Sequence, residues 1–450
     1  MSNNTTQSLL TTPLELIYCL LKNINQITAS FSTRDVRIQP DTTTDNYSDF
    51  QTLTTLNLGG NNIGVKGIKY LLIALENNTT LTTLDLQNNK IGDEGIQYLT
   101  NLLQDNTILI TLNLGGNEIG DEGTKYLASK IQNNATLKTL DLQNNKIKDE
   151  GIQSLACALE NNTTLTILNL GRNQINIDGI QHLANTIENN TTLTELNIEG
   201  NGIGNEALQY LAYALENNTT LTKLNLGRND IGVEGIQFIA NALENNTTLT
   251  TLNLGGNVLG NDGIELLTTA LQYNNTLTTL HLGWNSISVE GAQYLGNVLN
   301  NNSILVQLDL QSNELYDDGI QYIADALQNN ITLKTLNLAR NNISDKGAHD
   351  LASALENNTT LTNLHLALNH ITDEGARSLA NLLENNRTLT IVDLAFNEIC
   401  VEGIKYLANA LQKNSVLITL DLRYNRLDVN DRSILSGLYE CNETGNILML

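Results

Sequence analysis

The sequence predicts an α/β solenoid with a parallel β-sheet on one face and α-helices on the other. A 28-residue repeat runs without insertion from Leu53, thirteen complete copies followed by a partial fourteenth. The first part of each repeat alternates apolar and polar residues like a strand, and the second part has apolar residues at helical spacing. One strand and one helix bury their apolar faces only against neighbouring copies, so this periodicity indicates a stacked array.

The repeat that begins at Leu221 shows both patterns. Leu224 and Leu226 alternate with polar residues, as in a strand with one buried face. In residues 235–243, Ile236, Ile239 and Leu243 recur at helical spacing, which predicts an amphipathic helix. We expect the strands to pair in parallel on a concave face and the helices to lie on the convex face of a horseshoe.

Polar residues at fixed repeat positions are expected to hold the turns. The residue eight after each first leucine is Asn, and its amide is expected to satisfy main-chain groups in the turn. A second Asn, such as Asn134, follows each predicted helix and is expected to be left-handed. Asp-Glu-Gly sequences start several helices, where acidic groups favour the dipole. Ala207 replaces the usual Gly in the sixth repeat, and we expect little consequence.

The repeated pattern LxxLxLxxNxIxxxGxxxLxxxLxxN resembles the leucine-rich repeats of the ribonuclease inhibitor class. That class includes the recognition arrays of NOD-like receptors and the Ran GTPase-activating proteins. The resemblance covers Leu53 to about Leu438 and implies a leucine-rich repeat horseshoe. It does not identify a partner, because the class shares an architecture and not a function.

The sequence divides into three parts. Residues 1–52 are expected to form a polar segment and a capping helix, which opens with a capping box at Thr12–Glu15. Residues 53–416 hold the thirteen complete repeats. Residues 417–450 hold the partial fourteenth repeat and a C-terminal cap, to which the apolar residues 447–450 contribute. We find neither the pattern of a secretory signal nor an apolar run long enough to span a membrane.

Composition favours an acidic cytoplasmic protein with reduced cysteines. The chain has 24 basic and 48 acidic residues, a net charge of –24 that repels phosphate, so we expect neither nucleic acid nor membrane as a partner. The four cysteines are scattered, which predicts neither disulfides nor a zinc site. Cys157, between two alanines, is expected to be a small core residue. We also expect a monomer.

No enzymatic motif occurs in the sequence. It contains no GxxxxGK[ST], HExxH or GxSxG, and its five histidines form no ligand set. We therefore expect no catalytic residue, no metal site and no cofactor. Seven helix tyrosines, at one repeat position, are expected to pack their rings on the next repeat and keep their hydroxyls in water: Tyr70, Tyr98, Tyr126, Tyr210, Tyr294, Tyr322 and Tyr406.

The repeats diverge most at the residue seven after the first leucine. It is Gly or Asn in the first four repeats and becomes Trp284, Ser312, Arg340, Leu368, Phe396 and Tyr424 in the last six. Trp, Tyr and Arg are the residues that most often anchor interfaces. The predicted partner-binding residues are His281, Trp284, Arg340, His365, Leu368, Asp393, Phe396, Asp421, Arg423 and Tyr424.

This pattern predicts a non-enzymatic scaffold that binds a protein partner in its concave face. Two other functions stay open: a GTPase-activating protein resembling the Ran GTPase activators, and an inhibitor resembling ribonuclease inhibitor. A structural explanation also stays open, in which the bulky residues cover the last repeats near an open end.

Overall fold

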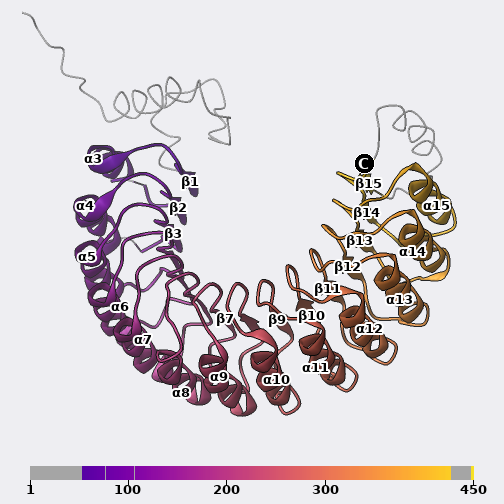
Figure 1. The fold of residues 1–450 in the computed structure, drawn as a ribbon. Helices are drawn as coiled ribbons and strands as arrows, with labels where there is room; N and C mark the ends of the chain where they lie inside the picture. Colours follow the sequence, from indigo (N-terminus) through magenta and orange to yellow (C-terminus); the bar gives the residue numbers. More distant parts are fainter. Residues whose placement is uncertain (1–52, 77, 106, 427–446, 450) are drawn as a thin grey trace, which may run out of the picture. The chain divides into compact units, whose positions relative to one another are not determined.

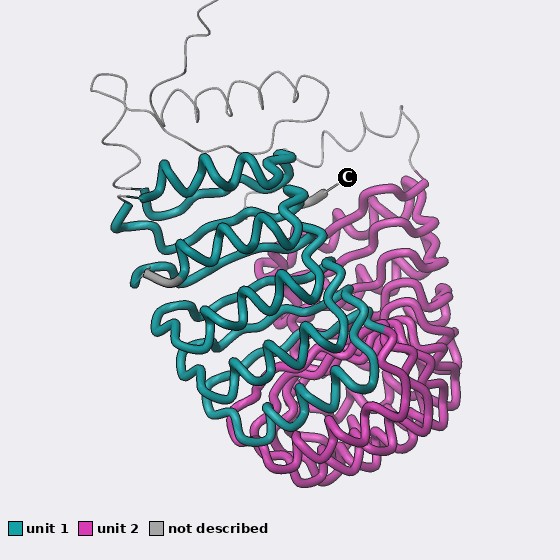
Figure 2. Tube along the Cα trace, turned by 90° about the vertical axis from the view of Figure 1, so that its left-hand side faces the viewer, with its two compact units in different colours: residues 1–201 teal, residues 202–450 magenta. Residues whose placement is uncertain are grey.

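The computed structural model describes residues 53–76, 78–105, 107–426 and 447–449. Short strands and helices alternate along this part of the chain (Figure 1). The chain forms two compact units, residues 1–201 and 202–450 (Figure 2). Within each unit the strands form one layer, on the concave side, and the helices form the other (Figure 1). The predicted capping helix in residues 1–52 and most of the predicted C-terminal cap lie outside the described residues.

The described elements of the first unit are β1 (Thr55–Asn57), α3 (Gly64–Leu75), β2 (Thr83–Asp85), α4 (Gly92–Asp105), β3 (Thr111–Asn113), α5 (Asp121–Ile131), β4 (Thr139–Asp141), α6 (Asp149–Asn161), β5 (Ile167–Asn169), α7 (Ile177–Asn189) and β6 (Glu195–Asn197).

Those of the second unit are α8 (Leu208–Asn217), β7 (Lys223–Asn225), α9 (Val233–Asn245), β8 (Thr251–Asn253), α10 (Gly260–Leu271), β9 (Thr279–His281), α11 (Val289–Leu299), β10 (Gln307–Asp309), α12 (Tyr316–Leu327), β11 (Thr335–Asn337), α13 (Asp345–Leu355), β12 (Asn363–His365), α14 (Asp373–Asn385), β13 (Ile391–Asp393), α15 (Val401–Leu411), β14 (Thr419–Asp421) and β15 (Ile447–Met449).

The strands of each unit pair in parallel with a register of one repeat. Leu56 pairs with Leu84 in the first unit, and Leu308 pairs with Leu336 in the second. The core between strands and helices is a stack of leucine and isoleucine layers. In the repeat of β7, both strand leucines and all three apolar helix residues named above are at most 1% exposed. Burying each such side chain contributes about 1.5–3 kcal/mol to stability. The parallel register and the buried layers confirm the predicted solenoid.

The Asn at the eighth position ties each turn to its neighbours. The Asn117 Nδ2 atom donates to the carbonyls of Leu114 (3.0 Å) and Gly115 (3.2 Å) and to that of Leu86 in the preceding repeat (2.9 Å). Its Oδ1 accepts from the backbone N–H of Asn89 at 2.8 Å. The side chain therefore satisfies main-chain groups of two consecutive turns, as predicted.

The Asn after each helix works differently from the prediction. Asn162 is extended, with φ –80° and ψ 127°, so the expectation of a left-handed conformation is wrong. Its Oδ1 accepts from the N–H groups of Thr164 (3.0 Å) and Leu165 (2.7 Å), and its Nδ2 donates to the Ile131 carbonyl (2.7 Å). Side-chain hydrogen bonding, rather than backbone conformation, explains why Asn recurs here.

Acidic residues in the first turn of a helix cap the helix of the next repeat. The Asp345 Oδ1 atom accepts from the N–H groups of Thr372 (2.7 Å) and Gly375 (2.9 Å) at the start of α14. Thr372, whose N–H donates the first of these bonds, is extended, with φ –103°. The sequence pattern correctly places the acid near the positive end of a helix, but its hydrogen bonds go to the following one.

A second kind of turn occurs where the repeat position that Asp345 occupies holds an apolar residue. Val65, Val233 and Val289 occupy that position, and the residue 27 further along then has a positive φ: Gly92 (61°), Gly260 (59°) and Tyr316 (52°). Its N–H donates to the carbonyl of a turn Asn instead, such as that of Asn341 at 3.0 Å from Tyr316. Helix starts therefore take one of two forms, according to one residue in the preceding repeat.

The repeat of Ala207 has a helix, α8, of 10 residues that starts at Leu208, whereas α9 has 13 residues. Gly204 before it is left-handed (φ 71°) and its N–H donates to the Asn229 carbonyl at 2.9 Å, so this repeat, which follows the apolar Ile177, has the second kind of turn. One sequence expectation about a single residue is wrong. Cys157 is exposed and not a core residue, because it lies on the outward face of α6.

The helix tyrosines pack against charged side chains of the preceding repeat. The Lys69 Nζ atom lies 4.0 Å from the centre of the Tyr98 ring, and the Arg377 guanidinium lies 5.9 Å from that of Tyr406. Among the tyrosines of this row, Tyr70, Tyr210, Tyr322 and Tyr406 keep more than a third of their surface exposed. The exposure agrees with the expected solvated hydroxyls, whereas both ring contacts are to the preceding repeat and not to the next one, so that part of the expectation is wrong. None of the described helices combines the length and apolarity that crossing a membrane requires.

Candidate functional site

The second unit carries a row of bulky residues at left-handed backbone positions. We call this row the ridge; it consists of Trp284, Arg340, Leu368, Phe396 and Tyr424, with φ values of 60°, 55°, 58°, 55° and 61°. The same repeat position is also left-handed in the first repeats, where Gly60, Asn88, Gly116 and Asn144 occupy it. Gly and Asn adopt this conformation readily, whereas in other residues it costs about 1–2 kcal/mol.

The ridge side chains are exposed. The exposed fraction is 50% for Trp284, 51% for Leu368, 46% for Phe396 and 70% for Tyr424. Each of these residues therefore combines a left-handed backbone with a side chain that keeps about half or more of its surface in solvent. A role in covering the last repeats would give lower exposure.

Two contacts order the ridge. The rings of Phe396 and Tyr424, on consecutive repeats, stack with centres 4.2 Å apart and planes at 16°. The Arg340 guanidinium lies 4.7 Å from the centre of the Trp284 ring, although the two residues are two repeats apart. Ser312 occupies the position between them, and its short side chain leaves room for this contact.

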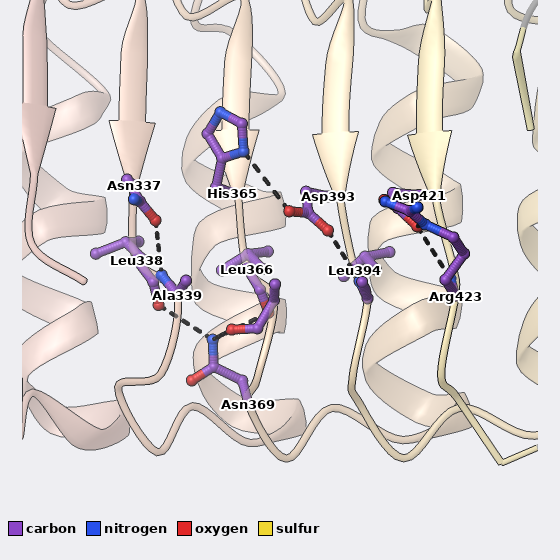
Figure 3. Close-up of polar contacts among 12 residues, drawn as sticks. Asn337, Leu338, Ala339, His365, Leu366, Asn369, Asp393, Leu394, Asp421 and Arg423 are labelled. Atoms are coloured by element: carbon purple, nitrogen blue, oxygen red, sulfur yellow. Dashed lines mark hydrogen bonds and ion pairs between the residues drawn. The ribbon is translucent and has the colours of Figure 1, made fainter. Parts of the chain in front are cut away.

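Acidic and histidine side chains form a second row, at the ends of the same strands. The His281 Nδ1 atom lies 3.4 Å from the Asp309 Oδ2 atom, and that of His365 lies 3.8 Å from the Asp393 Oδ2 atom (Figure 3). Each Asp also accepts a backbone N–H two residues on, 3.0 Å from Ala395 in the case of Asp393. Asn337 makes the same bond to Ala339, so the fold itself does not require an acid here (Figure 3).

Asp421 and Arg423 form a closed pair at β14 (Figure 3). The Arg423 Nε atom donates to both carboxylate oxygens, at 2.9 and 3.1 Å, and its Nη2 donates to Oδ2 at 2.5 Å. Burial acts to raise the pKa of Asp421, but the hydrogen bonds from the Arg423 side chain and backbone outweigh it and hold the pKa below its ordinary value. This carboxylate is ionised and internally satisfied.

The structure places nine of the ten predicted residues in two adjacent rows on the strand side of the second unit, and the tenth, Arg423, lies between the rows. It brings together Trp284 with Arg340, Phe396 with Tyr424, and Asp421 with Arg423. It does not bring His281 and His365 together, and the described part of the chain holds no cluster of His, Cys, Asp or Glu suited to a metal ion. Asp309 was missed, although its register opposite His281 could have revealed it.

A family profile described as "Leucine Rich repeat" matches ten segments that together cover more than half of the chain: residues 51–72, 77–99, 105–128, 217–240, 245–267, 273–296, 301–324, 329–352, 357–380 and 385–408. The chain belongs to the leucine-rich repeat family. A profile described as "TMOD/LMOD Leucine-rich domain" matches residues 122–226. Domains of this family typically mediate protein–protein interactions.

Three solved structures match the chain to different extents. The TLR13–ssRNA13 complex matches with a TM-score of 0.50 and 22% identity over 79% of this chain and 44% of that one. An internalin (inlF) from Listeria monocytogenes str. 4b F2365 has a TM-score of 0.45 and 23% identity, over 87% and 99%. Leiomodin-1 actin-binding site 2 has a TM-score of 0.30 and 24% identity, over 34% and 88%. No curated protein sequence matches the chain.

Proposed function

We propose that this leucine-rich repeat protein is a non-enzymatic scaffold whose ridge, on the strand side of the second unit, binds a protein partner. The observation that carries the proposal is the combination of backbone strain and exposure along the ridge. Trp284, Leu368, Phe396 and Tyr424 occupy positions that favour Gly or Asn, yet about half or more of each side chain faces solvent. Residues other than Gly and Asn held in the left-handed region are concentrated at functional sites.

The composition of the ridge supports a protein as the partner. Aromatic side chains and an arginine supply the large contact area and directional contacts that concentrate binding energy in protein interfaces. The neighbouring row contains Asp309 and Asp393 and the chain carries a net charge of –24, which disfavours a polyphosphate backbone. The ssRNA in the TLR13 complex and the actin-binding site of leiomodin-1 are features of those two proteins and do not identify the partner of this chain.

A variant that copies the first repeats tests this proposal. In Trp284→Gly/Phe396→Asn/Tyr424→Asn, each residue becomes one that the same position carries elsewhere in the chain. We expect the unfolding midpoint to stay equal or rise, because strain is removed, and partner binding to be lost. The measurement compares proteins captured by wild type and variant from source-cell extract, followed by titration of the purified partner.

The matched control is Asn88→Gly/Asn144→Gly, at the same repeat position in the first unit. It is expected to keep every partner. If all captured partners bind the ridge variant as tightly as they bind wild type, the proposed surface is wrong. Accelerated GTP hydrolysis by a captured GTPase, at substoichiometric amounts of this protein, would instead identify a GTPase activator.

A further inference from the structure

We propose that Arg340, held over the Trp284 ring, recognises a carboxylate on the partner, next to an apolar side chain that packs on Leu368 and Phe396. The inference rests on the proposed function and names the partner's chemistry: a protein segment in which Asp or Glu lies within a few residues of a large apolar residue.

The first step is the state of the Arg340 side chain. The Arg340 guanidinium carbon lies over the Trp284 ring, 4.7 Å from its centre, a contact that holds the cation against the ring without using a hydrogen-bond acceptor. Within the described residues, the Arg340 side chain has no carboxylate or carbonyl partner. A cation that is fixed in orientation and has free donors is prepared to bind an anion.

Other arginines of the second unit already use their donors. Arg423 donates to the Asp421 carboxylate, and Arg387 donates to two backbone carbonyls. The Arg426 Nη2 atom lies 2.7 Å from the Glu398 Oε2 atom. Arg377 lies 3.5 Å from Glu374. Arg340 differs from these four in being oriented by a ring and not by an acceptor. That difference points to an acceptor that arrives with the partner.

The position of Arg340 on the ridge sets the spacing of the partner's groups. Arg340, Leu368 and Phe396 lie in the turns that follow the consecutive strands β11, β12 and β13. Parallel strands lie about 4.8 Å apart, and the guanidinium leans across Ser312 toward Trp284, away from Leu368, so it lies about 10–15 Å from the apolar surface. An extended chain covers that distance in three to five residues, at about 3.3 Å each.

A carboxylate fits this site better than a phosphate. The planar donor edge of a guanidinium matches the two oxygens of a carboxylate. Asp309 and Asp393 lie on the same strand face, and the protein carries a net charge of –24, so the penalty is larger for a dianion than for a single carboxylate. The apolar residues next to Arg340 also favour a partner group with little charge beyond the carboxylate.

A peptide selection followed by matched titrations tests the inference. The full chain is used to select from a displayed library of random peptides, and we expect enrichment of Asp or Glu about three to five residues from Leu, Phe, Tyr or Trp. The best peptide is then compared with its Asn or Gln counterpart. For wild type, the amide peptide should bind about tenfold or more weakly, the size expected for a charged hydrogen bond.

Variants assign that discrimination to Arg340. In Arg340→Gln the acidic and amide peptides should bind within about twofold of each other, whereas Arg228→Gln, at the same repeat position after β7, should keep the full difference. Trp284→Ala should reduce the discrimination and Trp284→Phe should retain it, because the ring orients the guanidinium.

The outcomes separate this inference from the proposed function. If Phe396→Asn abolishes peptide binding but acidic residues are not enriched, the ridge is a binding surface and the carboxylate inference is wrong. The same conclusion follows if Arg340→Gln still discriminates between the acidic and amide peptides. If selected peptides bind Phe396→Asn as tightly as wild type, the ridge itself is wrong. Tighter binding of a phosphoserine peptide than of its Glu counterpart would assign Arg340 to phosphate and overturn the inference.

Discussion

The left-handed position before α12 holds Tyr316, whereas Gly92 and Gly260 fill the same position before α4 and α10. Its φ of 52° costs a tyrosine about 1–2 kcal/mol relative to glycine, and 49% of its side chain is exposed. We therefore expect Tyr316→Gly to raise the free energy of unfolding by about 1 kcal/mol, measured by urea denaturation. Lys148→Gly, at an extended position with φ –118°, should lower it. Destabilisation by both changes would show that Tyr316 is not strained.

The Asp421–Arg423 pair makes a pH-dependent contribution to stability. The pKa of Asp421 is lower in the folded state than the unfolded value of about 3.9, so its stabilisation is complete above that value and is lost as pH falls below it. Arg423→Gln removes the guanidinium, which leaves burial to raise the pKa of Asp421. We expect wild type to be more stable than the variant at pH 7, with the difference disappearing below about pH 4.

Denaturation midpoints of both proteins between about pH 3 and pH 7 check this expectation, and carboxyl NMR titration reports the pKa of Asp421 directly. A stability difference that grows as the pH falls would have the opposite sign and contradict the assignment.

At the scale of the element, each helix start depends on one side chain from the preceding repeat. Asp345→Ala would leave the N–H groups of Thr372 and Gly375 without their acceptor, and would also remove the bond from the Thr372 hydroxyl at 2.6 Å. We expect a loss of about 1–3 kcal/mol in the free energy of unfolding, measured by denaturation. Val233→Ala, at the same position where no cap exists, should cost less. Equal losses in the two variants would argue against capping between repeats.

The sequence was sufficient to predict strands, helices and their stacking, because the periods of 2 and 3.6 and the 28-residue repeat act locally. It failed where a side chain reaches another repeat. Asp345 lies on one helix and caps the next, and Asn162 bonds to the carbonyl of Ile131. Because the ridge residues share one position of the 28-residue repeat, the sequence predicted that they form one row. It did not predict the Trp284–Arg340 contact, because that contact depends on side-chain reach across Ser312.

At the scale of the whole molecule, the excess of acidic charge lies largely off the strand face. Several glutamates fall in the last turns of helices, such as Glu216 in α8 and Glu244 in α9, next to the negative end of the helix dipole. The chain also shows the favourable arrangement: the Lys413 Nζ atom, just after α15, lies 3.0 Å from the Glu384 Oε2 atom. A solenoid sums the interactions of neighbouring repeats, so repeated like charges along one edge oppose folding.

Glu244→Lys places a cation at the C-terminus of α9, one repeat after Glu216, and lowers the negative charge of the whole chain. We expect it to stabilise the protein by a few tenths of a kcal/mol, because it favours the helix dipole and removes a like-charge pair. Glu244→Gln, which only removes the charge, should give about half of the gain. Since both charges are exposed, the gain should shrink in about 0.5 M NaCl, where screening acts over a few ångströms. Thermal denaturation of the three proteins at low and high salt measures it, and a gain that salt leaves unchanged would show that charge is not its cause.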